Sequence, residues 1–179
     1  RVMHWVQMKK VDYYPSHIVR QLYLQPGSEY IFAHIMLLTN SDRFFNLVQW
    51  LSGIGSLVGV NLITKRITKH SYAQISAVAL ASAIPMGILQ STSTQNDYVL
   101  TFWFVCFVYF ALFKKDDQLY PNAILAGIGL GLALLTKGMM YLCALPFLIA
   151  IVKMWYSHSA KKTCFIAFVL MLSVASMIN

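Results

Sequence analysis

The stretch STSTQNDYVLTFWFVCFVYFALF (Ser91–Phe113) decides the fold class of this chain. Seven polar residues end in a single carboxylate, Asp97, and the sixteen residues that follow carry no charge. Such an uncharged, aromatic-rich run is typical of a helix that lies in a lipid bilayer, where a charged side chain is costly. The stretch also raises a functional question, because Asp97 stands where this helix would emerge from the membrane.

The same contrast extends over the whole chain. Of its 179 residues, 58% are hydrophobic and only 11% are charged, against about 25% charged residues in soluble domains. Because the apolar residues form long runs, we predict an all-α, polytopic transmembrane helix bundle. The net charge of +8 comes from bases in short loops, so we interpret it as membrane topology and predict no nucleic-acid partner.

The apolar runs predict about six membrane spans within residues 41–179, the last of them truncated. The expected spans are Phe44–Thr64, Tyr72–Leu89 with a bend near Pro85, Asp97–Phe113, Asn122–Thr136, Tyr141–Val152, and Thr163 onward. GxxxG spacings occur in the first span, at Gly55 and Gly59, and in the fourth, at Gly127 and Gly131. This spacing would let another helix approach closely, but we favour ordinary helix packing as the interpretation of both pairs.

Residues 1–40 are mixed, aromatic and polar, and we expect them to form an outer loop. Two short amphipathic helices, around Val2–Lys10 and Ser28–Leu38, are expected to lie on the membrane surface. Trp5 and several tyrosines of this loop suit the membrane–water interface. Because the chain starts at an arginine and its last apolar run stops inside a span, we expect an internal fragment of a longer protein.

Loop charges predict which segments share one side of the membrane. Bases follow the first, third and fifth spans: Lys65, Arg66, Lys69, Lys114, Lys115, Lys153, Lys161 and Lys162. The positive-inside rule places these loops in the cytoplasm. Residues 1–40, residues 90–96 and the Lys137-Gly138 turn are therefore expected together on the outer, extracytoplasmic face, which we interpret as the periplasmic side of a bacterial inner membrane.

LAGIGLGLALLTKG (Leu125–Gly138) resembles the Gly-rich span ending in Leu-Thr-Lys-Gly of the C-type membrane glycosyltransferases (GT-C). This superfamily includes the dolichyl-phosphate-mannose protein mannosyltransferases and the aminoarabinose transferases of lipid A. DRFFNLVQWLSGIGSLVGVNLITKRI (residues 42–67) resembles the second helix of these enzymes. Their long first outer loop with two surface helices, and the acid after their second outer loop, resemble residues 1–40 and Asp97. The resemblance covers essentially the whole chain.

The resemblance implies a function. These enzymes move a sugar from a polyprenyl-phosphate donor in the membrane to an acceptor glycan, lipid or protein, with inversion at the anomeric carbon. Their main catalytic acid lies early in the first outer loop and is followed by a basic residue. We expect that acid a few residues before Arg1, so the fragment alone should be inactive and Asp97 would be a second catalytic acid.

The resemblance leaves the cofactor open. Aminoarabinose transferases carry Glu-Lys-Pro-Pro before the second surface helix, where the Glu binds a metal and the Lys holds the lipid phosphate. Here the aligned residues are Leu24-Gln25-Pro26-Gly27, and both groups are replaced. The cofactor is therefore left unknown; for a divalent metal, Glu29 and His34 are the candidate ligands. Arg20 and Lys137 are the candidates for the phosphate contact.

Each candidate residue also has a structural interpretation. Asp97, the candidate catalytic group, and Asn96, a candidate substrate contact, both suit the start of a helix. Lys137 suits the membrane interface, and Arg20 suits an exposed loop. His4, the remaining substrate-binding candidate, lies next to Trp5 and is suited either to stack on a sugar or to the interface.

Two other functions remain as alternatives. A transporter or flippase of a lipid-linked substrate would have polar groups or broken helices at the bilayer midplane. Gln49, Asn61 and Gln74 instead lie toward the ends of the expected spans, which favours an enzyme working at the membrane face. A non-catalytic assembly subunit would tolerate loss of the Asp97 carboxylate. The sequence contains no Gly-rich phosphate loop, CxxC or Gly-x-Ser-x-Gly motif of a soluble enzyme.

Overall fold

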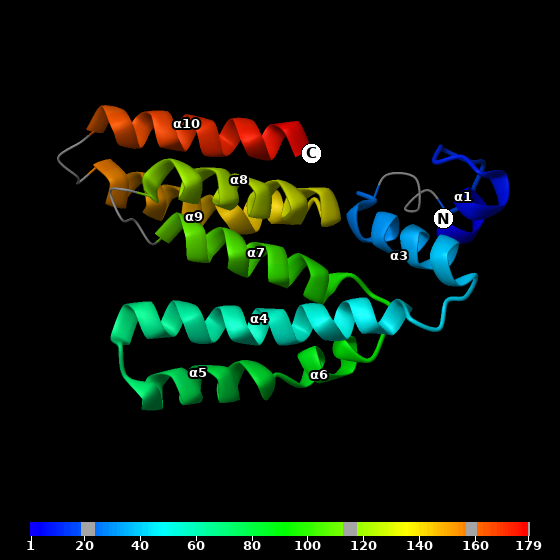
Figure 1. The fold of residues 1–179 in the computed structure, drawn as a ribbon, viewed down its shortest axis with the longest axis horizontal. Coiled ribbons are helices and arrows are strands. Elements are labelled where there is room, and N and C mark those ends of the chain that lie inside the picture. The colour runs from blue at the N-terminus through cyan, green and yellow to red at the C-terminus, as the bar shows by residue number, and fades with distance from the viewer. Residues whose placement is uncertain (19–23, 113–117, 157–160, 179) are drawn as a thin grey trace.

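A computed structural model describes residues 1–18, 24–112, 118–156 and 161–178, and within these ranges the regular elements are helices (Figure 1). Two short helices precede the bundle, α1 (Val2–Met8) and α3 (Gly27–Thr39). The bundle consists of α4 (Phe45–Thr68), α5 (Ser71–Ser82), α6 (Pro85–Ser91), α7 (Asp97–Leu112), α8 (Leu119–Thr136), α9 (Met140–Tyr156) and α10 (Lys161–Ile178). The expected all-α fold is confirmed, and helices form where two short ones were expected in residues 1–40; their location on the membrane surface remains a prediction.

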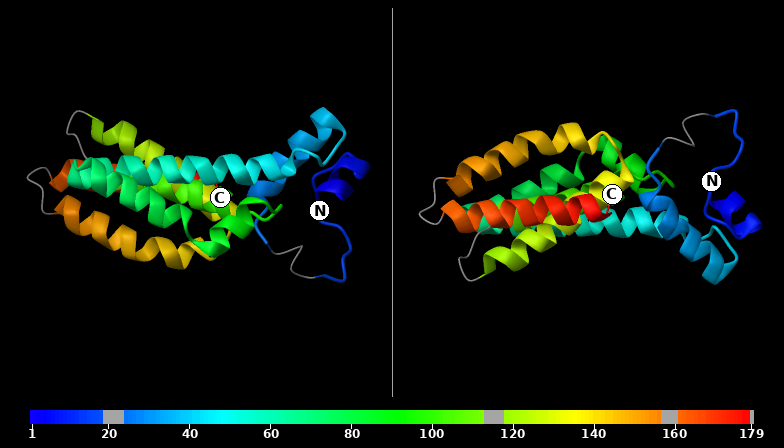
Figure 2. Two further views of the ribbon diagram at one scale, coloured as in Figure 1. Left: turned by 90° about the horizontal axis from the view of Figure 1, so that it is seen from below. Right: turned by 90° about the horizontal axis from the view of Figure 1, so that it is seen from above.

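The bundle helices form a row, with one helix behind it. Helix α4 contacts α5 and α7, α8 contacts α7 and α10, and α9 packs against α7, α8 and α10. Figure 2 shows α1 and α3 beyond one end of the bundle in both views. The starts of α4 and α7 and the end of α8 lie at this same end (Figure 1). The segments expected to share one face therefore do lie together.

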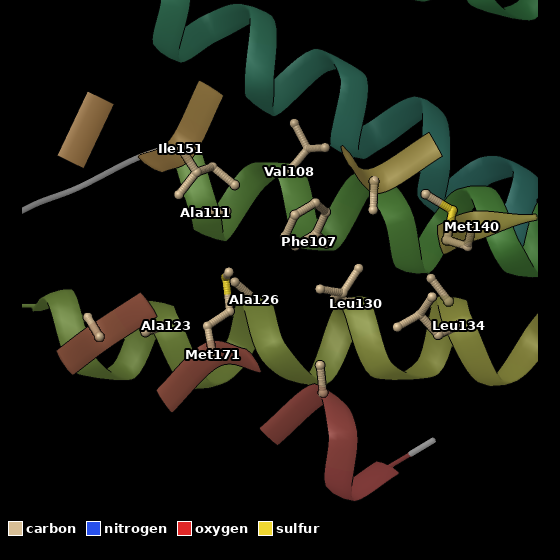
Figure 3. Close-up of a cluster of buried hydrophobic side chains, with 14 of the residues drawn as sticks. Phe107, Val108, Ala111, Ala123, Ala126, Leu130, Leu134, Met140, Ile151 and Met171 are labelled. Atoms are coloured by element: carbon tan, nitrogen blue, oxygen red, sulfur yellow. The ribbon is translucent and has the colours of Figure 1, made fainter. Parts of the chain in front are cut away.

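The hydrophobic core is centred on α8. Its small residues Ala126 and Ala133 are fully buried, and Phe107 of α7 and Met171 of α10 are buried on either side of it (Figure 3). Ile151 of α9 completes the cluster with 0% of its surface exposed. Because α8 presents small side chains, both neighbouring helices can approach it closely.

Glycines on opposite faces of α8 permit this approach. A Cβ atom at Gly127 would lie 2.6 Å from the Met171 carbonyl oxygen, and one at Gly131 would lie 2.9 Å from that of Ala175, both on α10. A Cβ at Gly129 would lie 2.9 Å from the Phe107 nitrogen on α7. The Gly127–Gly131 pair therefore does permit a close helix approach, which the sequence alone left as the less favoured interpretation, and Gly129 performs the same role toward α7.

Three described segments at most are long and apolar enough to cross a membrane. Helices α4 and α8 qualify alone, and α5 with α6 qualifies if the pair counts as one span. That pair is bent by 68° at a break, after which Pro85 opens α6, so the expected bend is confirmed. The apolar parts of α7, α9 and α10 are shorter helices, and six spans remain a prediction.

The N-terminal helices differ from the expectation in one respect. Trp5 was expected at the membrane–water interface, but its side chain is buried, with 7% of the residue exposed. Its ring stacks on Tyr30 of α3 at 5.6 Å, and its Nε1 donates a hydrogen bond to the Asp12 carbonyl oxygen at 3.0 Å. Trp5 therefore joins α1 to α3 rather than facing lipid.

The packing at α8 predicts different effects for two glycine substitutions. In Gly129→Ala the new methyl group meets backbone atoms of Phe107 and Trp103, which cannot rotate away, so we expect a loss of about 1–3 kcal/mol of stability. In Gly53→Ala the methyl group meets the Tyr98 ring at 3.5 Å, an ordinary contact, and better helix propensity should keep stability unchanged or raise it. Thermal unfolding in detergent measures both, and equal melting temperatures would contradict this account of the α7–α8 contact.

Candidate functional site

A cavity of about 560 Å³ lies at the end of the bundle next to α1 and α3. Segments distant in the chain surround it: the start of α1, the start of α3, the first turn of α4, the segment before α7, and the residue after α8. The lining residues are Arg1, Val2, Met3, Leu24, Ser28, Glu29, Phe32, Phe45, Thr94, Gln95, Asn96, Asp97 and Lys137. The first loop, the Asp97 turn and Lys137 thus converge on one site, as the loop charges suggested.

Asp97 and Lys137 form an ion pair in the wall of this cavity. Asp97 is the first residue of α7 and Lys137 directly follows α8, and the two helices run in opposite directions, so these ends meet (Figure 1). The Lys137 ammonium contacts Oδ1 of Asp97, with 31% and 25% of the two side chains exposed. An acid at a helix N-terminus and a base at a C-terminus are each favoured by the helix dipole. The two candidate residues therefore also stand at the helix ends where their charges are favoured.

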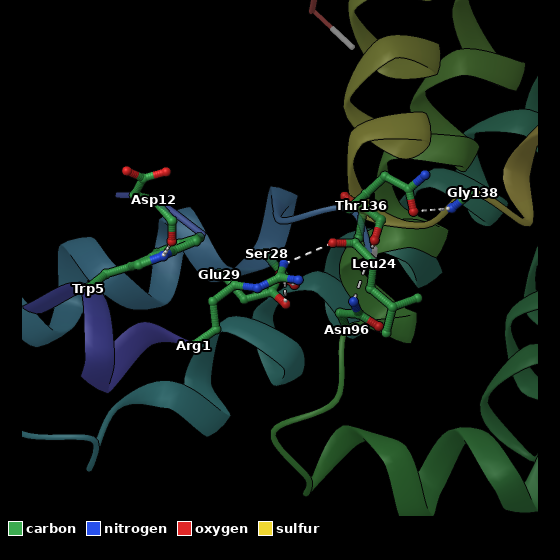
Figure 4. Close-up of polar contacts among 10 residues, drawn as sticks. Arg1, Trp5, Asp12, Leu24, Ser28, Glu29, Asn96, Thr136 and Gly138 are labelled. Carbon is green, nitrogen blue, oxygen red and sulfur yellow. Dashed lines mark hydrogen bonds and ion pairs between the residues drawn. The ribbon is translucent and has the colours of Figure 1, made fainter. Parts of the chain in front are cut away.

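Two further hydrogen bonds fix the turn that carries Lys137. The Gly138 backbone N–H donates to Oε1 of Gln25 at 3.0 Å, and Nδ2 of Asn96 donates to the Thr136 carbonyl oxygen at 3.5 Å (Figure 4). In the sequence resemblance described above, Gln25 aligns with the lysine of the aminoarabinose transferases. In this chain its amide fastens the first loop to the Lys137 turn, a structural role that the sequence did not indicate.

Arg1 supplies a second cation to the cavity. Its guanidinium donates to the Leu24 carbonyl oxygen at 2.9 Å, lies 3.5 Å from Oε1 of Glu29, and lies 5.8 Å from the centre of the Trp5 ring (Figure 4). Only 10% of the Arg1 side chain is exposed. Sequence reasoning missed this residue, although the resemblance does place a base early in the first outer loop.

The other candidate residues lie elsewhere or are engaged differently. His4 stacks on Tyr14 at 4.3 Å and does not line the cavity. The Glu29 carboxylate contacts Arg1 and the Ser28 hydroxyl, while His34 is exposed. The described ranges contain no group of three His, Cys, Asp or Glu side chains that could hold a metal, and the Glu29–His34 pair stays a prediction. Arg20 lies outside the described residues.

A smaller cavity of about 160 Å³ adjoins the first, and Arg1 and Leu24 line both. Trp5, Tyr14 and Asp12 also line it. A hydrogen bond from Lys10, at 2.5 Å, holds the pKa of the Asp12 carboxyl below its usual value, and a hydrogen bond from a backbone N–H adds to the effect. The contact with Lys10 therefore favours the ionised form of Asp12, which lines the smaller cavity.

The fold and the cavity together define a helical membrane protein with a charged site at one end of its bundle. The family model described as dolichyl-phosphate-mannose-protein mannosyltransferase matches residues 25–178. The chain belongs to this family, and membership implies glycosyltransferase activity of the GT-C type, with a lipid-linked sugar donor and an acceptor. No match was found among curated proteins or among solved structures.

The ion pair in the cavity wall predicts energetic coupling between Asp97 and Lys137. Asp97→Asn and Lys137→Met should each lower stability, and the double variant should lose less than the sum, by on the order of 1 kcal/mol for such a partly exposed pair. The Lys10–Asp12 pair, with side chains 72% and 49% exposed, is the matched control and should show almost no coupling. For each pair, denaturant unfolding of the wild type, the two single variants and the double variant measures the coupling free energy. Additive losses at Asp97 and Lys137 would mean that the two side chains are not paired.

Proposed function

We propose that the larger cavity binds a polyprenyl-phosphate sugar and that the sugar is transferred there to an acceptor. The observation that supports this most strongly is that two cations, Lys137 and Arg1, line one cavity together with the Asp97 carboxylate. The leaving group of this reaction is a lipid phosphate whose negative charge grows as its bond to the sugar breaks. Cations placed around that phosphate stabilise the transition state.

The two cations suit different parts of this task. Lys137 is a compact charge at the end of α8, able to contact one phosphate oxygen. Arg1 presents a planar guanidinium that can bind two oxygens at once. Arg1 pairs with Glu29 of α3, and Lys137 pairs with Asp97 of α7. A phosphate that contacts both cations would therefore lie between the first loop and the bundle.

Asp97 is proposed to act as a general base toward the acceptor. The acceptor oxygen forms a bond to the anomeric carbon, its proton passes to Asp97, and the bond from that carbon to the phosphate oxygen breaks with its electrons going to the lipid phosphate. Attack from the side opposite the leaving group inverts the anomeric centre. Because Lys137 contacts Asp97 in the free protein, a phosphate that takes over Lys137 would also release the carboxylate for this step.

The proposal includes an outer location for the site. Lys65, Arg66 and Lys69 lie at the far end of α4, and by the positive-inside rule that end would be cytoplasmic. The cavity would then open on the extracytoplasmic face, the periplasmic side in a bacterial inner membrane. The donor would enter sideways from the surrounding membrane lipid, and the acceptor, a glycan, lipid or protein, from the aqueous side.

Loss of the Asp97 carboxylate tests the base. In the full-length protein, Asp97→Asn should lower the rate of sugar transfer from polyprenyl-phosphate mannose by about 10²–10⁴-fold, measured with labelled donor in membranes that carry the native acceptor. Asp42→Asn is the control, because Asp42 is an exposed acid between α3 and α4 outside the cavity lining. If the wild type, Asp97→Asn and Asp42→Asn transfer sugar at rates within about twofold of each other, the role of Asp97 is overturned.

Loss of the Lys137 charge tests the phosphate contact. Lys137→Met should raise the KM for the polyprenyl-phosphate donor by about tenfold or more, since a hydrogen bond to a charged group is lost, and Lys137→Arg should recover part of the effect. Lys69→Met, at the opposite end of the bundle, should leave the KM unchanged. An unaltered donor KM in Lys137→Met would show that the phosphate is bound elsewhere.

A further inference from the structure

Gln49 of α4 has a buried side chain whose amide is unsatisfied. Its exposed fraction is 0%, and neither its nitrogen nor its oxygen has a hydrogen-bond partner among the described residues. A buried polar group without a partner costs stability, and nearly all such groups in folded proteins are satisfied. A ligand that is bound during the reaction can supply the partner.

The register of the helices places Gln49 at the level of the larger cavity. Helices α4 and α7 both run away from the cavity end (Figure 1), and Gly53 of α4 faces the Tyr98 ring of α7. One helical turn before Gly53, Gln49 comes level with the segment before α7. Thr94, Gln95 and Asn96 of that segment line the cavity.

The direction of the side chain agrees with this placement. Side chains of a helix tilt toward its N-terminus, and residues four apart lie on one face. The residue four positions before Gln49 is Phe45, which lines the cavity and stacks on Phe32 of α3 at 4.9 Å. From its position on α4, the Gln49 side chain is expected to extend toward the wall that Phe45 and Phe32 form, although Gln49 does not itself line the cavity.

We propose that Gln49 determines sugar specificity by hydrogen bonding to one hydroxyl of the donor sugar when the Phe45 ring turns aside. The inference rests on the proposed function, which assigns Arg1 and Lys137 to the phosphate, so that the attached sugar occupies the neighbouring part of the cavity. A carboxamide both donates and accepts hydrogen bonds, as a hydroxyl does, whereas a phosphate only accepts and a polyprenyl chain does neither. A neutral sugar is therefore the part of the donor that matches Gln49.

Donor analogues test this inference in the full-length protein. Sugar transfer is measured from polyprenyl-phosphate mannose and from four analogues that lack the 2-, 3-, 4- or 6-hydroxyl. The wild-type protein should discriminate at least tenfold against one analogue, because a site that hydrogen-bonds a hydroxyl rejects the molecule lacking it. In Gln49→Leu, kcat/KM for the complete donor should fall at least tenfold, while kcat/KM for this analogue stays unchanged. The variant would then no longer distinguish the complete donor from the analogue that lacks this one hydroxyl.

Stability separates this role from a packing role. Gln49→Leu should melt at the same temperature as the wild type or higher, since the substitution removes the unsatisfied amide. Gln49→Met, which keeps the side-chain length, is measured in parallel so that a folding defect in one variant does not decide the outcome. Gln74→Leu is the matched control, because Gln74 belongs to α5, which does not line the cavity, and it should leave the donor profile unchanged.

Three outcomes would overturn the inference. If Gln49→Leu and Gln49→Met transfer the complete donor as the wild type does, Gln49 is only a buried amide. If they lose activity equally for all donors, Gln49 does not distinguish a hydroxyl. Absence of transfer by the wild type from every donor would overturn the proposed function and this inference with it, whereas normal wild-type transfer with either of the first two results overturns this inference alone.

Discussion

The close contact between α7 and α8 determines where the polar ends of the bundle meet. Gly129 allows the backbone of α8 to approach Phe107 of α7, and this contact fixes the register of two helices that run in opposite directions. The register brings the start of α7 to the end of α8, and with them Asp97 to Lys137. A shift of one turn would move the two charges about 5 Å apart along the helix axis and would remove the cavity wall that they share.

The charges in the cavity are balanced in pairs. Lys137 contacts Asp97, and Arg1 contacts Glu29, so each cation is already held by a carboxylate. Such pairs keep a partly buried site stable without a ligand, because an unpaired charge there would be costly. In the proposed reaction a lipid phosphate would compete with these carboxylates, so its binding would depend on both cations and its arrival would be coupled to the release of Asp97.

The sequence predicted the features that follow from local pattern and failed at those that depend on distant contacts. Uncharged runs predicted the helical membrane bundle. Loop charges predicted the grouping of Asp97 with Lys137, because the distribution of Lys and Arg among the loops determines the topology of a membrane protein. The hydrogen bond from Gly138 to Gln25 joins residues 113 positions apart, and no periodicity reveals it. The burial of Trp5 and the unsatisfied amide of Gln49 likewise depend on which helices become neighbours.

The bend at Pro85 leaves α5 too short to cross a bilayer alone. Helix α5 has 12 residues and extends about 18 Å, less than the roughly 30 Å of a bilayer's hydrocarbon core, and after the bend α6 runs at 68° to it. A bilayer responds to a short apolar segment by thinning around it. Helix α6 leads directly into the segment that lines the larger cavity. If α5 alone sets the local thickness, the lipid headgroups next to that cavity would lie deeper than elsewhere, and in the proposed reaction a lipid phosphate would lie closer to Lys137.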